Sequence, residues 1–404
     1  MKRIFIAIIT VAFSIGMANA QHHLLAQLSE QMETNSQLYR EQLGRGEFKE
    51  AEATLIKLVE LMYTTSIYKY PELNVSKGAL NTQKGMYQYD LACVYAVDGN
   101  KKMALEALEQ SVDNGYNGYD NMAWDKDLES LRKDKKFKQL LEIVKERRTI
   151  NVLRKSNPYN FDDNTEVPKF EYQSTNSPLQ LVRDYFQLDT IPGKDNELEH
   201  IKNLLHFVHD NIRHDGGSRT ICEYTAIDIY NYAKATGKGV NCRMLAICLC
   251  DMYLSMGYKA RVVTCLSADP NDYECHVINT VYSETLDKWL YIDPTMDAWV
   301  MDEEGTMLSI AEVRQRLIDD QPLVLCETAN WNHENQQTKE YYLENYMAKN
   351  LYYFVCKSHS CFNQETIYRP YDNEDVRLIP VGFTNSNFQC PTTTNPDVFW
   401  AKPE

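Results

Sequence analysis

The sequence predicts an α+β protein in which a helical domain precedes a domain of helices and antiparallel strands. Apolar residues recur at helical spacing through residues 21–150, which indicates several amphipathic helices. Farther along the chain, residues 243–256 are apolar on nearly every side, as is typical of a central buried helix. Three strand-like runs then follow, at 259–266, 276–282 and 288–292. Helices followed by antiparallel strands indicate the α+β class.

Length and composition suit an ordinary globular protein. The chain has 404 residues, enough for two or three domains. Hydrophobic residues make up 44% and charged residues 25%, which argues against large-scale disorder. The formal net charge is −15, whereas nucleic-acid binding needs clustered Lys and Arg. We therefore expect no nucleic-acid partner.

Residues 1–20 resemble a signal peptide. A basic start, Lys2 and Arg3, precedes an apolar run over 4–15 that is too short to span a bilayer. Residues 18–20 form a small-x-small cleavage signal, so the mature chain is expected to begin after them. The protein is predicted to be exported, to the periplasm or beyond the cell, with no membrane span later in the chain.

The helical domain, 21–150, contains a stretch that resembles a tetratricopeptide repeat. Residues 87–96 and 102–112 form two predicted amphipathic helices, separated by a turn at 99–100. Ala104 is a small residue early in the second helix and allows the close helix approach typical of such repeats. We therefore predict a tetratricopeptide-like domain with a possible protein partner. A generic helical bundle is the alternative.

The rest of the chain divides by composition. Residues 151–180 are polar, with scattered Asn, Asp, Pro and Ser, and indicate a linker or an irregular lead-in. The second domain is predicted over 181–325 and opens with an amphipathic helix at 196–212. Residues 326–404 are rich in aromatic and turn residues and form a predicted C-terminal extension that packs on the core. Whether these aromatic side chains also wall a substrate cleft stays open.

The eleven cysteines raise the question of disulfides in an exported chain. The odd count leaves at least one thiol unpaired. Cys356 and Cys361 are near enough in sequence to pair locally, whereas Cys248 and Cys250 point to different faces of one helix. The sequence has no CxxC pair and no zinc-type cysteine spacing.

A group of histidines invites a metal site, since His200, His206, His209 and His214 lie within fifteen positions of one another. His206 and His209 share a helix face, but no carboxylate completes a recognised ligand motif. Solvated or partly buried helix histidines are the favoured interpretation. We therefore predict neither a metal nor a cofactor.

Cys242 is the candidate nucleophile. It follows the glycine-containing loop 237–241 and begins the apolar helix. The N–H groups and dipole of a helix N-terminus favour a thiolate, which is the reactive form in covalent acyl transfer. Its backbone N–H could also form half of an oxyanion hole. Taken alone, one cysteine among eleven is more often structural.

His276 and Asp293 change that balance. His276 begins one predicted strand and Asp293 ends the next. If the strands pair about a turn centred near Glu284 and Thr285, these two residues lie opposite each other, roughly 5 Å apart at Cβ. The carboxylate could then orient the imidazole and leave its other nitrogen for the thiol. The pattern predicts Cys242, His276 and Asp293 as a catalytic triad.

Four blocks of sequence resemble the transglutaminase-like superfamily. They are 237–242, 257–263, 276–282 and 288–295, and they occur in the family's order at suitable spacing. Residues 207–213 also resemble the helix that precedes the family's core. The resemblance covers about 195–300, implies a papain-like fold and carries the triad onto the same cysteine, histidine and aspartate.

The chain departs from the family pattern in two places. After the histidine many members have a small residue and an aromatic residue, where this chain has Val277 and Ile278. The family's second oxyanion donor lies upstream of the nucleophile, with Tyr224 and Tyr230 as candidates here. These departures bear on substrate preference more than on the triad.

The predicted function is cysteine-dependent acyl transfer on amide bonds of peptides or peptide-like substrates. Cys242 attacks the carbonyl carbon, His276 protonates the leaving amine, and Asp293 holds the imidazole in the required tautomer. Hydrolysis, as by a protease or amidase, is favoured over crosslinking. The alternative is a non-catalytic scaffold that binds a partner protein through the helical repeats. The presence of all three triad positions favours the enzyme.

Overall fold

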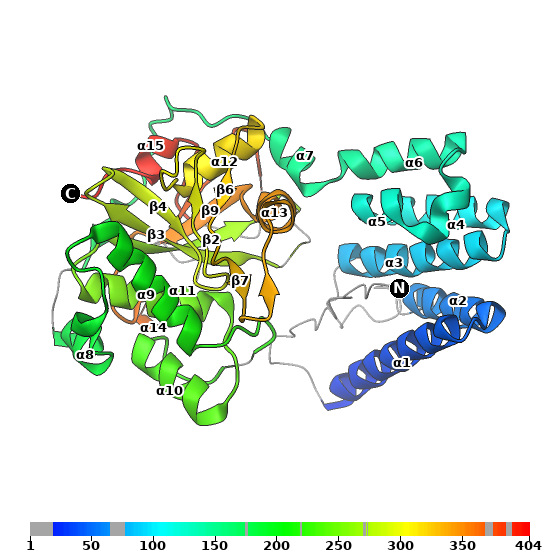
Figure 1. Cartoon of the computed structure of the whole chain (residues 1–404), viewed down its shortest axis with the longest axis horizontal. Helices are drawn as coiled ribbons and strands as arrows, with labels where there is room; N and C mark the ends of the chain where they lie inside the picture. Colours follow the sequence, from blue (N-terminus) through cyan, green and yellow to red (C-terminus); the bar gives the residue numbers. More distant parts are fainter. Residues whose placement is uncertain are drawn as a thin grey trace. The chain divides into compact units, whose positions relative to one another are not determined.

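The computed structural model describes residues 19–64, 77–173, 177–218, 220–269, 272, 274–367, 375–384 and 390–404 (Figure 1). The chain divides into two compact units, Met1–Asn151 and Val152–Glu404. Most of the predicted signal peptide, residues 1–18, lies outside the described residues, and its last two residues open the first helix. Among the described helices, none combines the length and the apolar character needed to cross a membrane.

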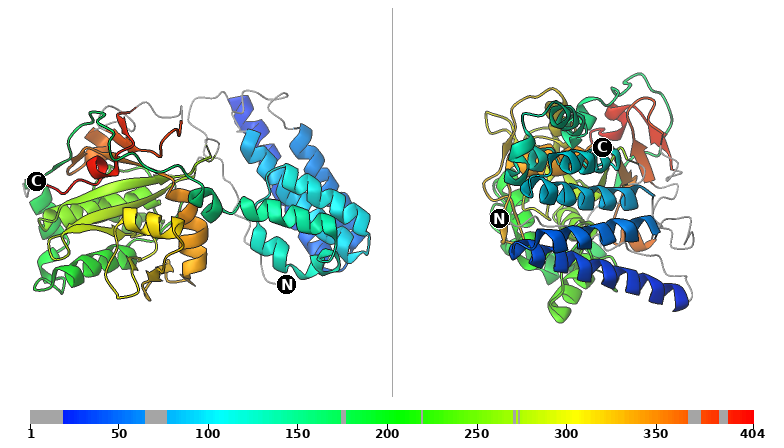
Figure 2. Two further views of the ribbon diagram at one scale, coloured as in Figure 1. Left: turned by 90° about the horizontal axis from the view of Figure 1, so that it is seen from above. Right: turned by 90° about the vertical axis from the view of Figure 1, so that its right-hand side faces the viewer.

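The first unit is built from helices packed side by side (Figure 2). They are α1 (Asn19–Gly44), α2 (Phe48–Thr64), α3 (Lys77–Val97), α4 (Lys101–Asp113), α5 (Tyr119–Trp124), the 3-10 helix η2 (Lys126–Leu131) and α6 (Lys135–Glu146). The short helix α7 (Thr149–Arg154) spans the boundary between the units.

The turn between α3 and α4 follows from its residues. Gly99 has a φ of 82°, which glycine adopts without steric cost. The Asn100 side chain accepts a hydrogen bond from the Met103 N–H and caps α4. Ala104 is fully buried in the core that α3 and α4 share. The predicted helical region is therefore present, while its tetratricopeptide character stays a prediction.

A six-stranded sheet forms the centre of the second unit, with strand order β12-β11-β9-β2-β3-β4. The strands are β2 (Ala260–Leu266), β3 (His276–Ser283), β4 (Lys288–Ile292), β9 (Tyr353–Lys357), β11 (Asp375–Leu378) and β12 (Thr392–Thr393). Neighbours pair antiparallel except β11 and β12, which run parallel. Every residue of β2 and β3 is buried, so both faces of the sheet are covered.

Helices cover the two faces of this sheet (Figure 1). One face carries α8 (Ser177–Tyr185), α9 (Glu197–Asn211), α10 (Ala226–Thr236) and α11 (Cys242–Ser255), and the other carries α12 (Ile310–Ile318) and α15 (Pro396–Phe399). α11 packs directly on β2 and β3, and residues 244–255 are all buried. Its apolar sequence thus corresponds to the predicted central helix, and the α+β class is confirmed.

Smaller elements complete the second unit. The helices among them are the 3-10 helix η3 (Leu188–Thr190), the π-helix η4 (Glu340–Met347), α13 (Ala348–Asn350) and α14 (Gln364–Ile367). Three two-stranded sheets pair β1 (Glu171–Tyr172) with β10 (His359–Ser360), β5 (Val300–Met301) with β6 (Val324–Leu325), and β7 (Asn330–Trp331) with β8 (Asn335–Gln336). β1 belongs to the stretch 151–180 that was predicted as a linker or an irregular lead-in, and it pairs in parallel with β10.

The register of the β3–β4 hairpin differs from the predicted one. Ile292 lies opposite Asn279, whereas a turn centred near Glu284 and Thr285 would place it opposite Val277. The predicted direct opposition of the two triad residues is therefore wrong by two positions. A shift of two keeps each side chain on its original face of the sheet, because the side-chain period of a strand is two. The loop at 284–287 has four residues and contains none of the Asn-Gly or Asp-Gly pairs that mark the centre of a two-residue hairpin turn.

The C-terminal extension, 326–404, completes the sheet. β9 pairs with β2, with Val263 opposite Cys356, and β11 then pairs with β9. The sequence pattern indicated only aromatic-rich packing here, because strands buried on both faces show little polar alternation. Cys356 and Cys361, considered as a local disulfide, are both free and buried, and all eleven cysteines are free thiols.

Candidate active site

Cys242 is the first residue of α11, at the N-terminal end of the buried helix. Asn241 caps this helix, since its side chain accepts a hydrogen bond from the Met244 N–H at 3.1 Å. The Cys242 N–H lies in the first turn, where backbone N–H groups have no partner within the helix. The sulfur therefore sits beside a set of positively polarised N–H groups.

Cys242 has the opposite ionisation behaviour to the other ten cysteines. Burial raises the pKa of each of those thiols, as in Cys248 and Cys265, which have no cationic partner to offset it. Burial acts in the same sense on Cys242, but hydrogen bonds from His214 and His276, together with the charge of His276, lower its pKa to about 5. The Cys242 thiol is thus the one that ionises below neutral pH.

His276, the first residue of β3, lies against Asp293, which directly follows β4. Nε2 of His276 is 2.7 Å from Oδ2 of Asp293, and both side chains are buried. Burial by itself lowers a histidine pKa, but the charge and hydrogen bond of Asp293, together with Cys242, raise the pKa of His276 to about 10. The structure therefore brings together the three residues that the sequence predicts as a triad.

Asp293 accepts hydrogen bonds at both carboxylate oxygens. The Tyr342 hydroxyl donates to Oδ2 at 2.6 Å, beside His276, while the Thr295 and Met296 N–H groups donate to Oδ1 at 2.8 and 3.3 Å. Burial raises the pKa of this carboxyl group, but the charge of His276 and these donors hold it below its ordinary value. The carboxylate is therefore ionised and fixed in orientation.

Two tyrosines of the π-helix η4 reach the site. Tyr342 contacts Asp293, and the Tyr346 hydroxyl lies 3.1 Å from Nδ1 of His276, on the side of the ring opposite Asp293. The rings of Tyr346 and His276 also meet edge to face, with centroids 5.1 Å apart. The C-terminal extension therefore lines the candidate site as well as the sheet.

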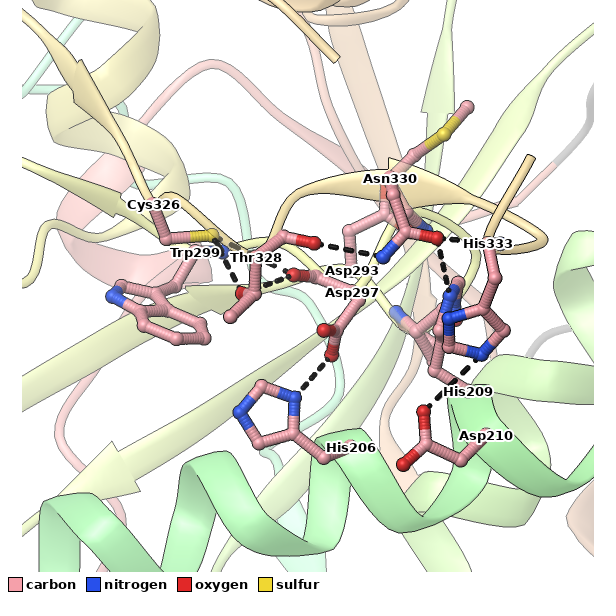
Figure 3. Close-up of polar contacts among 12 residues, drawn as sticks. His206, His209, Asp210, Asp293, Asp297, Trp299, Cys326, Thr328, Asn330 and His333 are labelled. Carbon is pink, nitrogen blue, oxygen red and sulfur yellow. Dashed lines mark hydrogen bonds and ion pairs between the residues drawn. The ribbon is translucent and has the colours of Figure 1, made fainter. Parts of the chain in front are cut away.

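The segment after Asp293 is fastened to α9 by two histidines (Figure 3). Nδ1 of His206 lies 2.6 Å from Oδ1 of Asp297. His209 is buried, with Nδ1 3.1 Å from the Pro294 carbonyl oxygen and Nε2 3.0 Å from Oδ1 of Asn330. Within the described part of the chain, no group of three or more His, Cys, Asp or Glu side chains is arranged to hold a metal ion. These helix histidines instead hold the chain that carries Asp293.

His214 is a site residue that the triad prediction leaves out. Its side chain hydrogen-bonds Cys242, and its Nδ1 accepts a hydrogen bond from Nε1 of Trp331 at 2.9 Å. The sequence offered one signal, since His214 directly follows the family-like helix 207–213. Tyr230, considered as an oxyanion donor, packs instead against Phe186, with ring centroids 5.2 Å apart.

Two segments match known protein families. Residues 186–294 match the family model of the transglutaminase-like superfamily. Residues 54–152, in the helical unit, match the model described as the A/B hydrolase-like, N-terminal domain. No curated protein matches the sequence.

One solved structure with similarity is described as that of a "Putative Cysteine Protease from Cytophaga hutchinsonii". The sequence identity is 14%, the TM-score is 0.24, and the match covers 36% of this chain and 48% of that one. This chain thus spans about half the length of that protein, and so low a TM-score adds nothing to the fold assignment. The family match, together with the sheet and buried helix described above, identifies residues 186–294 as a transglutaminase-like domain.

Proposed function

We propose that this protein is an exported cysteine-dependent acyl-transfer enzyme that acts on amide bonds of peptides or peptide-like substrates. Cys242, His276 and Asp293 would be its catalytic triad. The observation that carries the proposal is the assembly of Cys242 at the N-terminus of α11 with His276, whose Nε2 lies 2.7 Å from Oδ2 of Asp293. In this arrangement the pKa of Cys242 is lowered to about 5 and that of His276 is raised to about 10. Between those values the resting pair is a thiolate and an imidazolium, which is the reactive form for attack on a carbonyl carbon.

The geometry supports a two-step reaction. The Cys242 sulfur attacks the carbonyl carbon, a C–S bond forms, and the carbonyl electron pair moves onto oxygen. As this tetrahedral intermediate collapses, the C–N bond breaks and the imidazolium of His276 donates its proton to the leaving nitrogen. The resulting thioester is attacked by water or an amine, whose proton passes to the neutral imidazole, and the thiolate is released. Asp293 holds the ring and stabilises its positive charge throughout.

Hydrolysis is the outcome that we favour, since water reaches a thioester without needing a binding site of its own. Crosslinking would need a second site that positions an amine in place of water. Both outcomes use the same triad, so the choice between them is part of the test.

The experiment is to trap the acyl group. The mature protein is incubated with a peptide pool in the presence of hydroxylamine or a labelled amine, and products are read by mass spectrometry. We expect hydroxamates, amine adducts or cleaved peptides from the wild type and none from Cys242→Ala. Cys222→Ala is the matched control, since burial raises the pKa of the half-buried Cys222 thiol. Absence of product from wild type, with Cys242 inert to alkylation under reducing conditions, would favour the scaffold function instead.

A further inference from the structure

His214 is held beside Cys242 by its own backbone. The Val240 N–H donates to the Arg213 carbonyl oxygen at 2.9 Å, and the Asp215 N–H donates to the Val240 carbonyl oxygen at 2.7 Å. These two bonds form a parallel bridge between His214 and Val240, two residues before the nucleophile. The bridge holds His214 beside the loop that leads into Cys242, and a side-chain hydrogen bond from His214 helps to lower the pKa of Cys242.

The turn after β7 clamps the same residue from the other side. Oδ1 of Asn332 accepts from the His214 N–H at 2.8 Å, and Nδ2 of Asn332 donates to the His214 carbonyl oxygen at 3.0 Å. Trp331, the neighbouring residue, points its indole N–H at Nδ1 of the His214 ring. Three contacts from one hairpin therefore fix both the backbone and the ring of His214.

The contact with Trp331 determines where the ring carries its proton. An indole nitrogen can only donate, so Nδ1 of His214 must be an unprotonated acceptor. A neutral ring in that state has its proton on Nε2. Because Nδ1 is occupied by Trp331, Nε2 is the ring nitrogen that remains for the hydrogen bond to Cys242. His214 is therefore a hydrogen-bond donor to the sulfur, and it differs from His276, whose partner is a carboxylate.

We propose that His214 is a further catalytic residue whose Nε2–H, fixed by Trp331, donates first to the Cys242 thiolate and then to the oxyanion of the tetrahedral intermediate. The proposal rests on the acyl-transfer function proposed above. When the C–S bond forms, negative charge leaves the sulfur and appears on the adjacent carbonyl oxygen. A fixed neutral donor beside the sulfur can hydrogen-bond first to the thiolate and then to the oxyanion with little reorganisation. Such preorganisation is the condition for strong transition-state stabilisation. The Cys242 N–H would supply the second donor.

The test compares two reactions of the same sulfur in the full-length protein. Alkylation by iodoacetamide needs the thiolate but creates no oxyanion, whereas acylation by p-nitrophenyl acetate passes through a tetrahedral oxyanion. Both rates are measured at pH 7.5 with the signal of Cys242→Ala subtracted. In His214→Phe we expect acylation to fall about 100-fold relative to alkylation, the usual effect of removing one oxyanion donor. His214→Gln, which keeps an N–H donor, should recover part of the loss.

Trp331→Phe tests how the proton is placed. Without the indole donor, the neutral ring can carry its proton on Nδ1, so acylation relative to alkylation should fall at pH 7.5. A ring with its proton on Nδ1 presents an unprotonated Nε2, which cannot donate to the sulfur or to the oxyanion. His333→Asn is the matched control, since it removes an exposed imidazole from the same turn, and Asn tolerates the positive φ of 58° there.

The outcomes separate the two proposals. An unchanged ratio of acylation to alkylation in His214→Phe and Trp331→Phe, in variants that keep the wild-type circular dichroism, would overturn the role of His214 alone. A wild-type protein that shows neither reaction above the Cys242→Ala level would overturn the acyl-transfer function as well. If His214→Phe misfolds, the decision rests on the ratio of acylation to alkylation in His214→Gln and in Trp331→Phe.

Discussion

The ionisation of Cys242 is decided by two imidazoles rather than by the thiol itself. Cys248 lies less than two turns farther along the same helix, fully buried, and its pKa is raised because no cationic group offsets the loss of solvent. At Cys242 the loss of solvent also raises the pKa, but the hydrogen bonds of His214 and His276 and the charge of His276 outweigh it. Position at a helix N-terminus and contact with a charged donor act together here, as in other reactive cysteines.

This contrast gives a prediction for the pH dependence of alkylation. The iodoacetamide rate at Cys242 should be nearly constant from pH 6 to 8 and should fall on acidification with a midpoint near pH 5. The sign follows from a lowered pKa, because the thiolate exists above that value and is lost below it. In His276→Ala the midpoint should move upward, because the hydrogen bond and the charge of His276 are lost. A wild-type midpoint near the ordinary cysteine value would contradict the ion pair.

At the scale of elements, the π-helix η4 supplies two tyrosines to the candidate site, a role that the sequence alone did not assign. Tyr342 and Tyr346 are four residues apart, close to the number of residues in one π-helical turn, so both hydroxyls reach the same site. Tyr342 donates to Asp293, and its hydroxyl also lies 2.6 Å from that of the buried Tyr291. π-helical segments occur often at functional sites.

Tyr342→Phe should therefore affect both activity and stability. It removes a donor from Asp293, which raises the pKa of that carboxyl group, and it takes away the hydroxyl that Tyr291 contacts at 2.6 Å. A lost buried hydrogen-bond partner costs about 1–3 kcal/mol. We expect a lower unfolding free energy in denaturant titration and slower acyl transfer. Tyr341→Phe is the matched control, because Tyr341 is 61% exposed, and equal effects of the two changes would argue against the assignment.

The buried carboxyl group of Asp251 links α11 to the start of α10. Its Oδ2 accepts a hydrogen bond from the Ala226 N–H at 2.9 Å, but burial dominates and raises its pKa to about 8. Between the ordinary aspartate value near 4 and that value, the folded protein binds a proton that the unfolded chain does not. Stability contributed by this group is therefore lost as the pH rises from about 4 to 8.

Asp251→Asn should flatten this dependence, since an amide oxygen still accepts from Ala226 and nothing titrates. We expect the difference in melting temperature, variant minus wild type, to increase from pH 5 to pH 8, as measured by calorimetry. Asp319→Asn, at an exposed position, is the control. A difference that stays constant with pH would show that Asp251 does not titrate in this range.

At the scale of the whole second unit, Arg261 joins three parts of the chain. It is 1% exposed, and its guanidinium carbon lies 3.8 Å from the centroid of the Phe170 ring and 4.3 Å from that of Trp289. Nε donates to the Tyr172 hydroxyl and Nη1 to the Phe399 carbonyl oxygen, each at 2.6 Å. The planar guanidinium group of Arg261 therefore contacts the lead-in strand, the central sheet and the C-terminal segment at the same time.

Arg261→Lys should destabilise the second unit although it preserves the charge. An ammonium group cannot stack between two rings or donate in two fixed directions, so about 2 kcal/mol should be lost. For a unit of this size that corresponds to a fall of roughly 4–8 °C in melting temperature. Arg213→Lys, at an exposed ion pair with Glu334, should change it little. A fall no larger than that control would contradict the proposed role of Arg261.

The sequence by itself determined the α+β class, the order of helices and strands, and the cysteine, histidine and aspartate of the candidate triad. Those features are local, since an all-apolar run, a strand boundary and a helix N-terminus each depend on a few consecutive residues. It did not determine the hairpin register, the three C-terminal strands that complete the sheet, or the neighbours of the triad. Tyr346 lies 70 positions from His276, and Trp331 lies 117 from His214. Such contacts exist only once the sheet has assembled, so the tertiary structure alone decided which side chains surround the thiol and set its ionisation.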